Sequence, residues 1–250
     1  MIATDAVSRA SPDGNTILLV GNGSFVINPQ VRKLAYDPLT SFEPICHLWR
    51  SPTVIGVNST SPYRTLADLL TAARTRPGEL TVGASGPLTA FHIGIEQLKQ
   101  AANVEMTFVP YGGTVPAVNA LLGEHVTSAM GDYSIFDEYL KAGKLRALAV
   151  ASPTRLESLP EVPTVVESGF EGYDADSTYG VVVPSKTAKE KIAELMNWIT
   201  DALHDPEIRS KLVAVGLYPL GECGTEYGAF VRNQYEKYGR IIRSANIKAE

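Results

Sequence analysis

The stretch TVGASGPLTAFHIGIEQL, residues 81–98, decides the fold class because it joins a strand to a helix. Its first residues alternate like a β-strand, and apolar residues at spacings of three and four then predict a helix that lies on a core. These apolar residues are Leu88, Phe91, Ile95, Leu98 and Ala102. Glycines, hydroxyls and Pro87, which we expect at the first helical position, lie at the junction. Such a junction can direct several backbone N–H groups toward one point.

The same strand–helix pattern repeats four times between residues 53 and 151 and ends with the strand LRALAVA. Alternating strands and helices predict a parallel sheet wrapped by helices, with right-handed crossovers. Ligands of such sheets collect at the carboxyl ends of the strands. The sequence places there Ser85–Thr89, Tyr111–Thr114, Asp132–Ser134 and Ser152. We expect these residues to form one rim.

The segments on both sides of this block add further α/β elements. TILLV is predicted to be a strand that is followed by a Gly/Asn/Ser turn, residues 21–28, and a late strand precedes three helices. These helices are predicted at residues 188–203, after the cap Asp205-Pro206, and from about Thr225. We therefore predict an α/β fold of two lobes, with parallel-rich sheets and helices on both faces. Residues 1–52 and 175–250 would form lobe one, and residues 53–174 lobe two.

Composition excludes several classes of function. Apolar residues make up 44% of the chain and charged residues 20%, and the net charge is −5. Without a basic stripe, nucleic acid is not an expected partner. No apolar run is long enough to cross a bilayer, so we expect no direct insertion into a membrane. Residues 1–10 lack the pattern of a signal peptide.

Cysteine, histidine and glycine patterns predict neither a metal site nor a cofactor. Cys46 and Cys223 lie far apart and show no metal-ligand spacing, so we interpret both as small buried hydrophobic residues, with a single disulfide as the alternative. The histidines are not clustered. The stretch GNGSFV has two glycines of a dinucleotide-binding motif, but Val26 stands at the third position.

Enzymatic activity is not expected. Ser85 lies in GASGP, which differs from the GxSxG nucleophile motif at Pro87. His92 follows on the same element and suits a role at the helix terminus better than that of a general base. His204 lies at the polar end of another predicted helix. A serine hydrolase that uses Ser85 is therefore the weakest alternative.

Recognition of an anion without Lys or Arg fits the rim better. Hydroxyls and backbone N–H groups at helix N-termini can hold a carboxylate. Ser85, Thr89 and Thr114 suit this role, although each could simply cap a helix. Asp132 could also cap its helix, or it could accept a hydrogen bond from an amine or hydroxyl of a ligand. Tyr179 could pack in the core or cover a ligand with its ring.

A series of motifs along the whole chain resembles one family. SPDGNTILLVGNGSFVINPQV, TRPGELTVGASGPLTAFHIGIEQLK, VPYGGTVPAVNALLGEHV and YGVVVPSKT are similar to successive motifs of the Bug/TctC-type solute receptors of tripartite tricarboxylate transporters. The resemblance implies a two-lobed, type II-like periplasmic binding protein without enzymatic activity. It also implies that a small organic acid is captured between the lobes and delivered to membrane permease components.

The resemblance also assigns site residues. It places the ligand loops at residues 21–28 and 84–92, an acid at the end of a strand, and an aromatic residue near the hinge. The residues implied are Gly23, Ser24, Ser85, Gly86, Thr89, His92, Asp132 and Tyr179. Pro87 and Leu88 stand where many members have Asn and Gly, and Ala90 and Phe91 where they have Ser. These departures predict a less polar or aromatic acid as the ligand.

The resemblance starts at about Ala6, whereas family members begin with about one further βαβ unit, roughly 30 residues. The loop in that unit grips one end of the ligand. Either the sequence is a shortened form, or the protein lacks half of its clamp. We expect an incomplete first-lobe sheet with an exposed edge, and from it weak binding, dimerisation through the edge or another role. A degenerate family member without transport-competent binding is the main alternative function.

Overall fold

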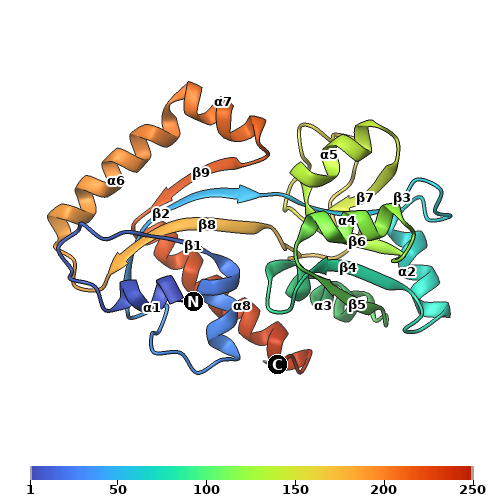
Figure 1. Cartoon of the computed structure of the whole chain (residues 1–250), viewed down its shortest axis with the longest axis horizontal. Coiled ribbons are helices and arrows are strands. Elements are labelled where there is room, and N and C mark those ends of the chain that lie inside the picture. Colours follow the sequence, from blue (N-terminus) through green and yellow to red (C-terminus); the bar gives the residue numbers. More distant parts are fainter. Residues whose placement is uncertain (1, 249–250) are drawn as a thin grey trace. The chain divides into compact units, whose positions relative to one another are not determined.

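Two β-sheets organise the chain, one in each of two units (Figure 1). The structure is a computed structural model that describes residues 2–248. Unit 1 consists of the residues up to Arg50 and from Ser177 onward, and unit 2 is Ser51–Asp176. The chain therefore passes from one unit to the other twice, at Arg50–Ser51 and at Asp176–Ser177. The α/β class and the presence of helices on both sheet faces are as predicted.

The sheet of unit 2 has the strand order β5-β4-β6-β3-β7. Its strands are β3 (Thr53–Asn58), β4 (Thr81–Ser85), β5 (Thr107–Tyr111), β6 (Ser128–Asp132) and β7 (Leu145–Val150). Strand β4 pairs in parallel with β5 and β6, but β3 runs antiparallel to both β6 and β7. The prediction of an all-parallel sheet is therefore wrong for TVIGVN, the strand β3. This strand runs in the opposite direction because the chain enters unit 2 at the end of the sheet where β6 finishes. Its first residue thus lies beside the last residue of β6.

Helices cover both faces of this sheet. They are α2 (Leu66–Thr75), α3 (Ala90–Ala102), α4 (Thr114–Leu122) and α5 (Tyr133–Lys141). Successive residues of a strand point to opposite faces. Ile55 packs in the core with α2 and α3, whereas a Cβ at the next residue, Gly56, would lie 2.7 Å from the ring of Phe136 on α5. The small residue at position 56 therefore allows α5 to approach the sheet.

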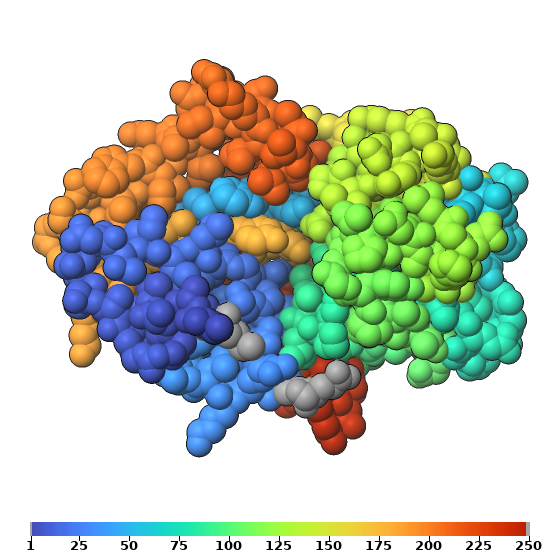
Figure 2. Space-filling view, viewed as in Figure 1, coloured from blue at the N-terminus to red at the C-terminus, as the bar shows by residue number. Residues whose placement is uncertain are grey.

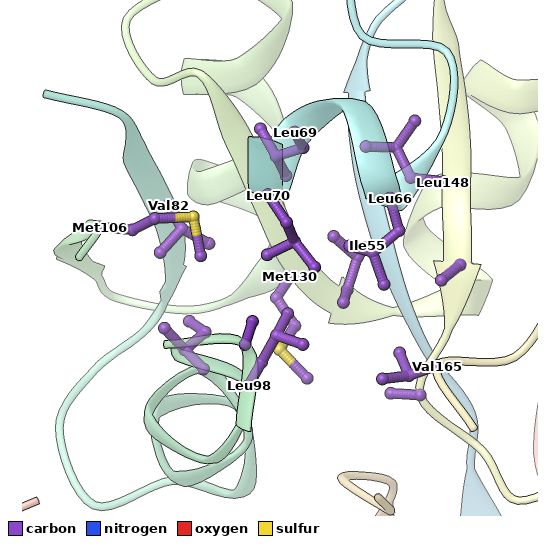
Figure 3. Packing of buried hydrophobic residues seen from close by; sticks show 14 of the residues in the cluster. Ile55, Leu66, Leu69, Leu70, Val82, Leu98, Met106, Met130, Leu148 and Val165 are labelled. Atoms are coloured by element: carbon purple, nitrogen blue, oxygen red, sulfur yellow. The ribbon is translucent and has the colours of Figure 1, made fainter. Parts of the chain in front are cut away.

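The main core of unit 2 lies between the sheet and helices α2 and α3. Figure 3 shows Leu66 and Leu70 of α2 close to Ile55 and Met130 of the sheet, with Leu98 of α3 nearby. The predicted α3 stripe is buried, since each of its members is less than 6% exposed. Hydrophobic burial of this size is the main term that stabilises the unit.

Local sequence signals define both ends of α2. Thr65 accepts a hydrogen bond from the amide of Asp68, and the Asp68 carboxylate accepts from the amide of Thr65, which completes a capping box. Hydrogen bonds from the Arg64 backbone, and then from Thr65, hold the pKa of Asp68 below its usual value. The helix ends before Pro77-Gly78, where Gly78 has a φ of +77°.

The sheet of unit 1 has the strand order β1-β8-β2-β9. Its strands are β1 (Leu18–Gly21), β2 (Phe42–Ser51), β8 (Ser177–Pro184) and β9 (Tyr218–Cys223). Strand β1 forms one edge and pairs in antiparallel fashion with β8. Strand β9 forms the other edge and pairs in antiparallel fashion with β2. Strands β2 and β9 and the first helix, α1 (Ile2–Ser8), were not predicted from the sequence.

Opposite faces of this sheet are covered by different helices (Figure 1). These are α6 (Lys189–His204) with α7 (Pro206–Ala214), and α8 (Thr225–Ser244), close to their predicted limits. Val181 and Val183 of β8 pack with α6, while a Cβ at Gly180 would lie 2.2 Å from the hydroxyl of Tyr227 on α8. In Figure 2 the orange atoms of α6 and α7 stand at the surface of unit 1. Leu203 is their one buried residue among those described.

A disulfide joins Cys46 of β2 to Cys223 of β9. The interpretation of both cysteines as free buried residues is therefore wrong, and the alternative of a single disulfide holds. The two residues are direct partners in the β2–β9 register, which places their side chains on one face. Their separation of 177 residues in the sequence hides this proximity.

The Tyr227→Phe substitution is expected to make unfolding of unit 1 less sensitive to alkaline pH. Burial raises the pKa of the Tyr227 phenol above its ordinary 10.0. Above that pH the unfolded chain ionises while the folded chain keeps the proton, so stability is complete below about pH 10 and falls above it by about 1.4 kcal/mol per pH unit. Urea unfolding at several alkaline pH values checks this. Equal slopes for wild type and variant would contradict it.

Candidate functional site

The β4–α3 junction forms the first part of the candidate site, and it lies within unit 2. Ser85 is the last residue of β4, Thr89 is the N-cap of α3, and the helix begins at Ala90. Pro87 therefore does not occupy the first helical position, contrary to the prediction. It belongs instead to a turn in which Leu88 has a φ of +61°. A left-handed conformation at a residue other than Gly costs about 1–2 kcal/mol, which marks this turn as strained.

Thr89 fixes the start of α3 through its hydroxyl. The oxygen accepts from the amide of His92 at 3.3 Å, and the hydroxyl donates to the carbonyls of Gly86 at 3.0 Å and Ser85 at 3.3 Å. The N-cap interpretation of Thr89 is therefore confirmed. The other amides of the first turn lack partners within the helix and, with the helix dipole, favour an anion at this end.

His92 packs flat against an aromatic ring of the neighbouring strand. Its ring centroid lies 4.4 Å from that of Phe108 on β5, with an angle of 22° between the planes. The amide of Leu88 donates to Nδ1 of His92 at 3.3 Å, so this nitrogen acts as an acceptor. His92 therefore holds the backbone of the strained turn at Leu88 through its ring nitrogen Nδ1.

Asp132 ends β6 and holds two hydroxyl groups. Its Oδ1 accepts from Ser51 at 2.8 Å and its Oδ2 accepts from Thr114 at 2.9 Å. Asp132 occupies the N-cap position of α5 but makes no capping hydrogen bond, and Gly113 rather than Thr114 is the N-cap of α4. The alternative in which Asp132 and Thr114 serve only as helix caps is therefore wrong, because the two side chains bind each other. A Cβ at Gly131 would lie 2.4 Å from Thr114, so glycine is needed beside this pair.

Strand pairing places these elements together at the carboxyl ends of β4, β5 and β6 in the unit 2 sheet. Ser85 pairs with Tyr111 of β5, and Thr53 pairs with Asp132. Strands β4 and β6 align at Gly83 and Ala129, and two further steps set Ser85 beside Gly131. The carboxyl ends of these strands therefore bring together the Ser85 hydroxyl, the start of α3 and the Asp132 carboxylate. This set of groups suits a ligand that carries both an anionic group and a hydrogen-bond donor.

Gly23 and Ser24 lie in unit 1, in a π-helical turn, Gly23–Ile27, that follows β1. This replaces the predicted irregular turn, and a 3-10 turn, Asn28–Gln30, continues it. The Asn22 side chain accepts from the amide of Gly23, and the Asn28 side chain donates to its carbonyl at 2.8 Å. The hydroxyl of Tyr36 donates to the carbonyl of Ser24 at 3.0 Å. Short π-helical turns occur often at functional sites.

Tyr179 lies on β8 of unit 1, opposite Gly21 in the register. Its ring centroid is 6.1 Å from that of Trp49 on β2. A Cβ at Gly21 would lie 3.2 Å from the Tyr179 ring, so this glycine lets the ring lie over the end of β1. Tyr179 therefore packs next to the π-helical turn of its own unit.

Two histidines of unit 2, His92 and His125, lie in different surroundings. His92 directs Nδ1 to a backbone amide, and His125 lies in a polar cavity with Thr81, at the far end of β4 from Ser85. Five strand residues span about 13 Å. Among residues 2–248 no group of three or more His, Cys, Asp and Glu could hold a metal ion. No helix in that range is long and apolar enough to cross a membrane.

Sequence reasoning missed Ser51, Thr53 and Asp176, which are 5%, 0% and 2% exposed. The Thr53 amide donates to Asp176 at 2.9 Å, and so does the hydroxyl of Ser152 at 2.8 Å. The sequence signal that could have revealed these residues is the pair of hydroxyl residues on either side of Pro52, in an otherwise apolar segment.

The Thr89→Ala substitution is expected to lower the stability of unit 2 by about 1 kcal/mol, because the variant loses the N-cap of α3. Thr89→Ser keeps the hydroxyl and is the matched control. Both tryptophans, Trp49 and Trp198, lie in unit 1, so unfolding of unit 2 is followed by far-UV circular dichroism. If Thr89→Ala and Thr89→Ser unfold at the same urea concentration, the hydroxyl does not stabilise the helix.

Comparison with known proteins identifies the family. The model of the tripartite tricarboxylate transporter family receptor, TctC, matches residues 1–247. The chain belongs to this family. A relative of this receptor from Pseudomonas sp. (strain P51), "UPF0065 protein in tcbD-tcbE intergenic region", is 30% identical over 250 residues. The alignment covers 100% of this chain and 74% of the relative.

Solved structures of similar receptors show the same fold. The structure of R. palustris Rpa4515 with adipate has a TM-score of 0.85 at 29% identity, and the alignment covers 99% of this chain and 83% of that chain. The periplasmic binding protein BugD has a TM-score of 0.82 at 29% identity, and the alignment covers 100% of this chain and 84% of the BugD chain. Of these two neighbours, BugD is named as a periplasmic binding protein. The predicted resemblance to Bug/TctC-type receptors is confirmed.

Proposed function

We propose that this receptor binds a small organic carboxylate and delivers it to the membrane components of a tripartite tricarboxylate-type transporter. The match of residues 1–247 to the receptor family carries the proposal. The proposed ligand contacts in unit 2 are Ser85, Gly86, Thr89, His92 and Asp132. Those in unit 1 are Gly23, Ser24 and Tyr179.

The local chemistry of unit 2 supports a carboxylate as the ligand. The N-terminus of α3 offers backbone N–H groups and the positive end of a 13-residue helix. The relative Rpa4515 was solved with adipate, a dicarboxylate. Asp132 would repel a second anionic group, but it can accept a hydrogen bond from a hydroxyl or an amine. A carboxylate that also carries such a donor therefore fits this rim.

The residues before and at the start of α3 that differ from the family's motif predict less about the polarity of the ligand than the sequence suggested. Phe91, one of the residues that stand in place of Ser, belongs to the core of unit 2 and is 5% exposed. Leu88 is 4% exposed. The preference for a less polar or aromatic acid therefore rests mainly on Pro87, which is exposed.

A periplasmic location is also proposed. The Cys46–Cys223 disulfide supports it, because disulfides form and persist in oxidising compartments such as the bacterial periplasm. BugD, which has the same fold, is a periplasmic binding protein.

A thermal-shift screen tests the function. Dicarboxylates of increasing length that include adipate are compared with mono- and tricarboxylates, hydroxy acids, acidic amino acids and aromatic acids. A ligand that binds only the folded state at about 100 times its Kd adds about 2.7 kcal/mol of stability, which is a clear rise in Tm. Titration of the best acid then follows for wild type, Thr89→Ala and Ser168→Ala. Ser168 donates to a carbonyl elsewhere in unit 2 and is the control.

Two outcomes separate the proposal from its alternative. One class of acid that raises Tm, with weaker binding to Thr89→Ala than to Ser168→Ala, supports a carboxylate receptor that uses the α3 terminus. An unchanged Tm with every acid contradicts it and favours a degenerate family member.

A further inference from the structure

The first segment that connects the units is fastened to unit 2 by side chains and backbone together. The hydroxyl of Ser51 donates to Asp132 at 2.8 Å. The amide of Tyr133 donates to the carbonyl of Pro52 at 2.8 Å, and the amide of Ala151 donates to that of Thr53 at 2.8 Å. Residues 51–53 are therefore bonded to unit 2, although Ser51 is also the last residue of β2, a strand of the unit 1 sheet.

The second connecting segment is bound to the first. The Asp176 carboxylate accepts from the amide of Thr53, and the hydroxyl of Thr53 donates to the carbonyl of Ala175 at 3.1 Å. The hydroxyl of Ser152 holds Asp176 from the end of β7. The two connecting segments are thus joined to each other inside unit 2.

Asp132 belongs to both the proposed binding rim and this fastening. One of its oxygens accepts from Ser51 on the connecting segment, and the other accepts from Thr114 on α4. Ser51 is 5% exposed and Thr114 is 7% exposed, so two buried hydroxyls hold the half-buried carboxylate in one orientation. A ligand donor that binds Asp132 therefore also changes the strength of the hydrogen bond that Asp132 accepts from Ser51.

We propose that Ser51 is a positioning residue that orients Asp132 for the ligand and, through it, couples ligand binding to the first connecting segment. The inference rests on the proposed function for its ligand, whereas the coupling between Ser51 and the segment is a property of the free protein. Hydrogen bonds to a charged acceptor contribute more than neutral ones, so their loss has a measurable effect.

The first test measures hydrogen exchange of the Tyr133 amide in the free protein. Ser51→Ala is expected to accelerate this exchange about tenfold, which corresponds to one charge-assisted hydrogen bond. Ser51→Thr keeps the hydroxyl and is expected to restore the wild-type rate. The Thr107 amide, which donates to the carbonyl of Leu80 within the same unit, reports general loosening and is expected to stay unchanged.

The second test uses malate, a carboxylate that also carries a hydroxyl donor, as the probe. Ser51→Ala is expected to bind malate about tenfold more weakly than wild type, with Ser51→Thr near wild type and Ser168→Ala unchanged. In wild type, saturating malate is expected to slow exchange of the Tyr133 amide, and in Ser51→Ala this slowing is expected to disappear.

The outcomes distinguish this inference from the proposed function. Equal Tyr133 exchange in wild type and Ser51→Ala overturns the inference, as does an equal acceleration at Thr107. If malate does not bind wild type but another hydroxy acid or an acidic amino acid from the screen does, that acid replaces malate. Absence of binding by every acid contradicts the proposed function and, with it, the ligand role of Ser51.

Discussion

Removal of the Cys46–Cys223 disulfide is expected to lower the free energy of unfolding of unit 1 by about 3–5 kcal/mol. The bond closes a loop of 177 residues, and a cross-link between such distant residues restricts the unfolded chain strongly. It also fixes β9, an edge strand without a fully buried residue, to Cys46, which is 0% exposed. Reduction therefore both frees the unfolded chain and loosens the edge of the folded sheet.

Tryptophan fluorescence can follow this effect in unit 1 alone, because both tryptophans lie there. Urea unfolding is compared for the oxidised protein, the reduced protein and the Cys46→Ser/Cys223→Ser variant. The reduced protein and the variant are expected to unfold at the same, lower urea concentration. Added reductant should leave the variant unchanged. Identical transitions of the oxidised and reduced protein would show that the bond does not contribute to stability.

Elements with local signals were predictable from the sequence. The capping box Thr65/Asp68, the apolar stripe of α3 and the Asp205-Pro206 start of α7 each depend on residues within a few positions. Local physical chemistry decides such features, so no knowledge of the rest of the fold is needed. The Thr89 cap at the candidate site belongs to the same class.

Features that depend on distant residues were not predictable. The antiparallel direction of β3 follows from where the chain enters unit 2, and β9 is recognisable only through its pairing with β2. Thr114 has the sequence position of a cap, yet its hydroxyl binds Asp132, which lies 18 residues further on. Ser51 reaches the same carboxylate from 81 residues away. A single sequence contains no record of these strand neighbours.

The Asp176→Ala substitution is expected to lower the free energy of unfolding of unit 2 by about 3–5 kcal/mol. Asp176 is 2% exposed and accepts from the amide of Thr53 and the hydroxyl of Ser152, both of which are 0% exposed. Hydrogen bonds to a charged group contribute about 1.5–3 kcal/mol each, and their loss leaves two buried donors without an acceptor. The effect is larger than the loss of one helix cap because water cannot reach these groups.

Asp176→Asn provides the control, since its amide oxygen can still accept from Thr53 in a side chain of the same size. Far-UV circular dichroism follows the unfolding of both units, while tryptophan fluorescence follows unit 1. Asp176→Ala should therefore shift the circular dichroism transition and leave the fluorescence transition in place, with Asp176→Asn between it and wild type. A shift of the same size in both signals would mean that Asp176 stabilises more than unit 2. Unchanged unfolding would mean that the two connecting segments are held together without it.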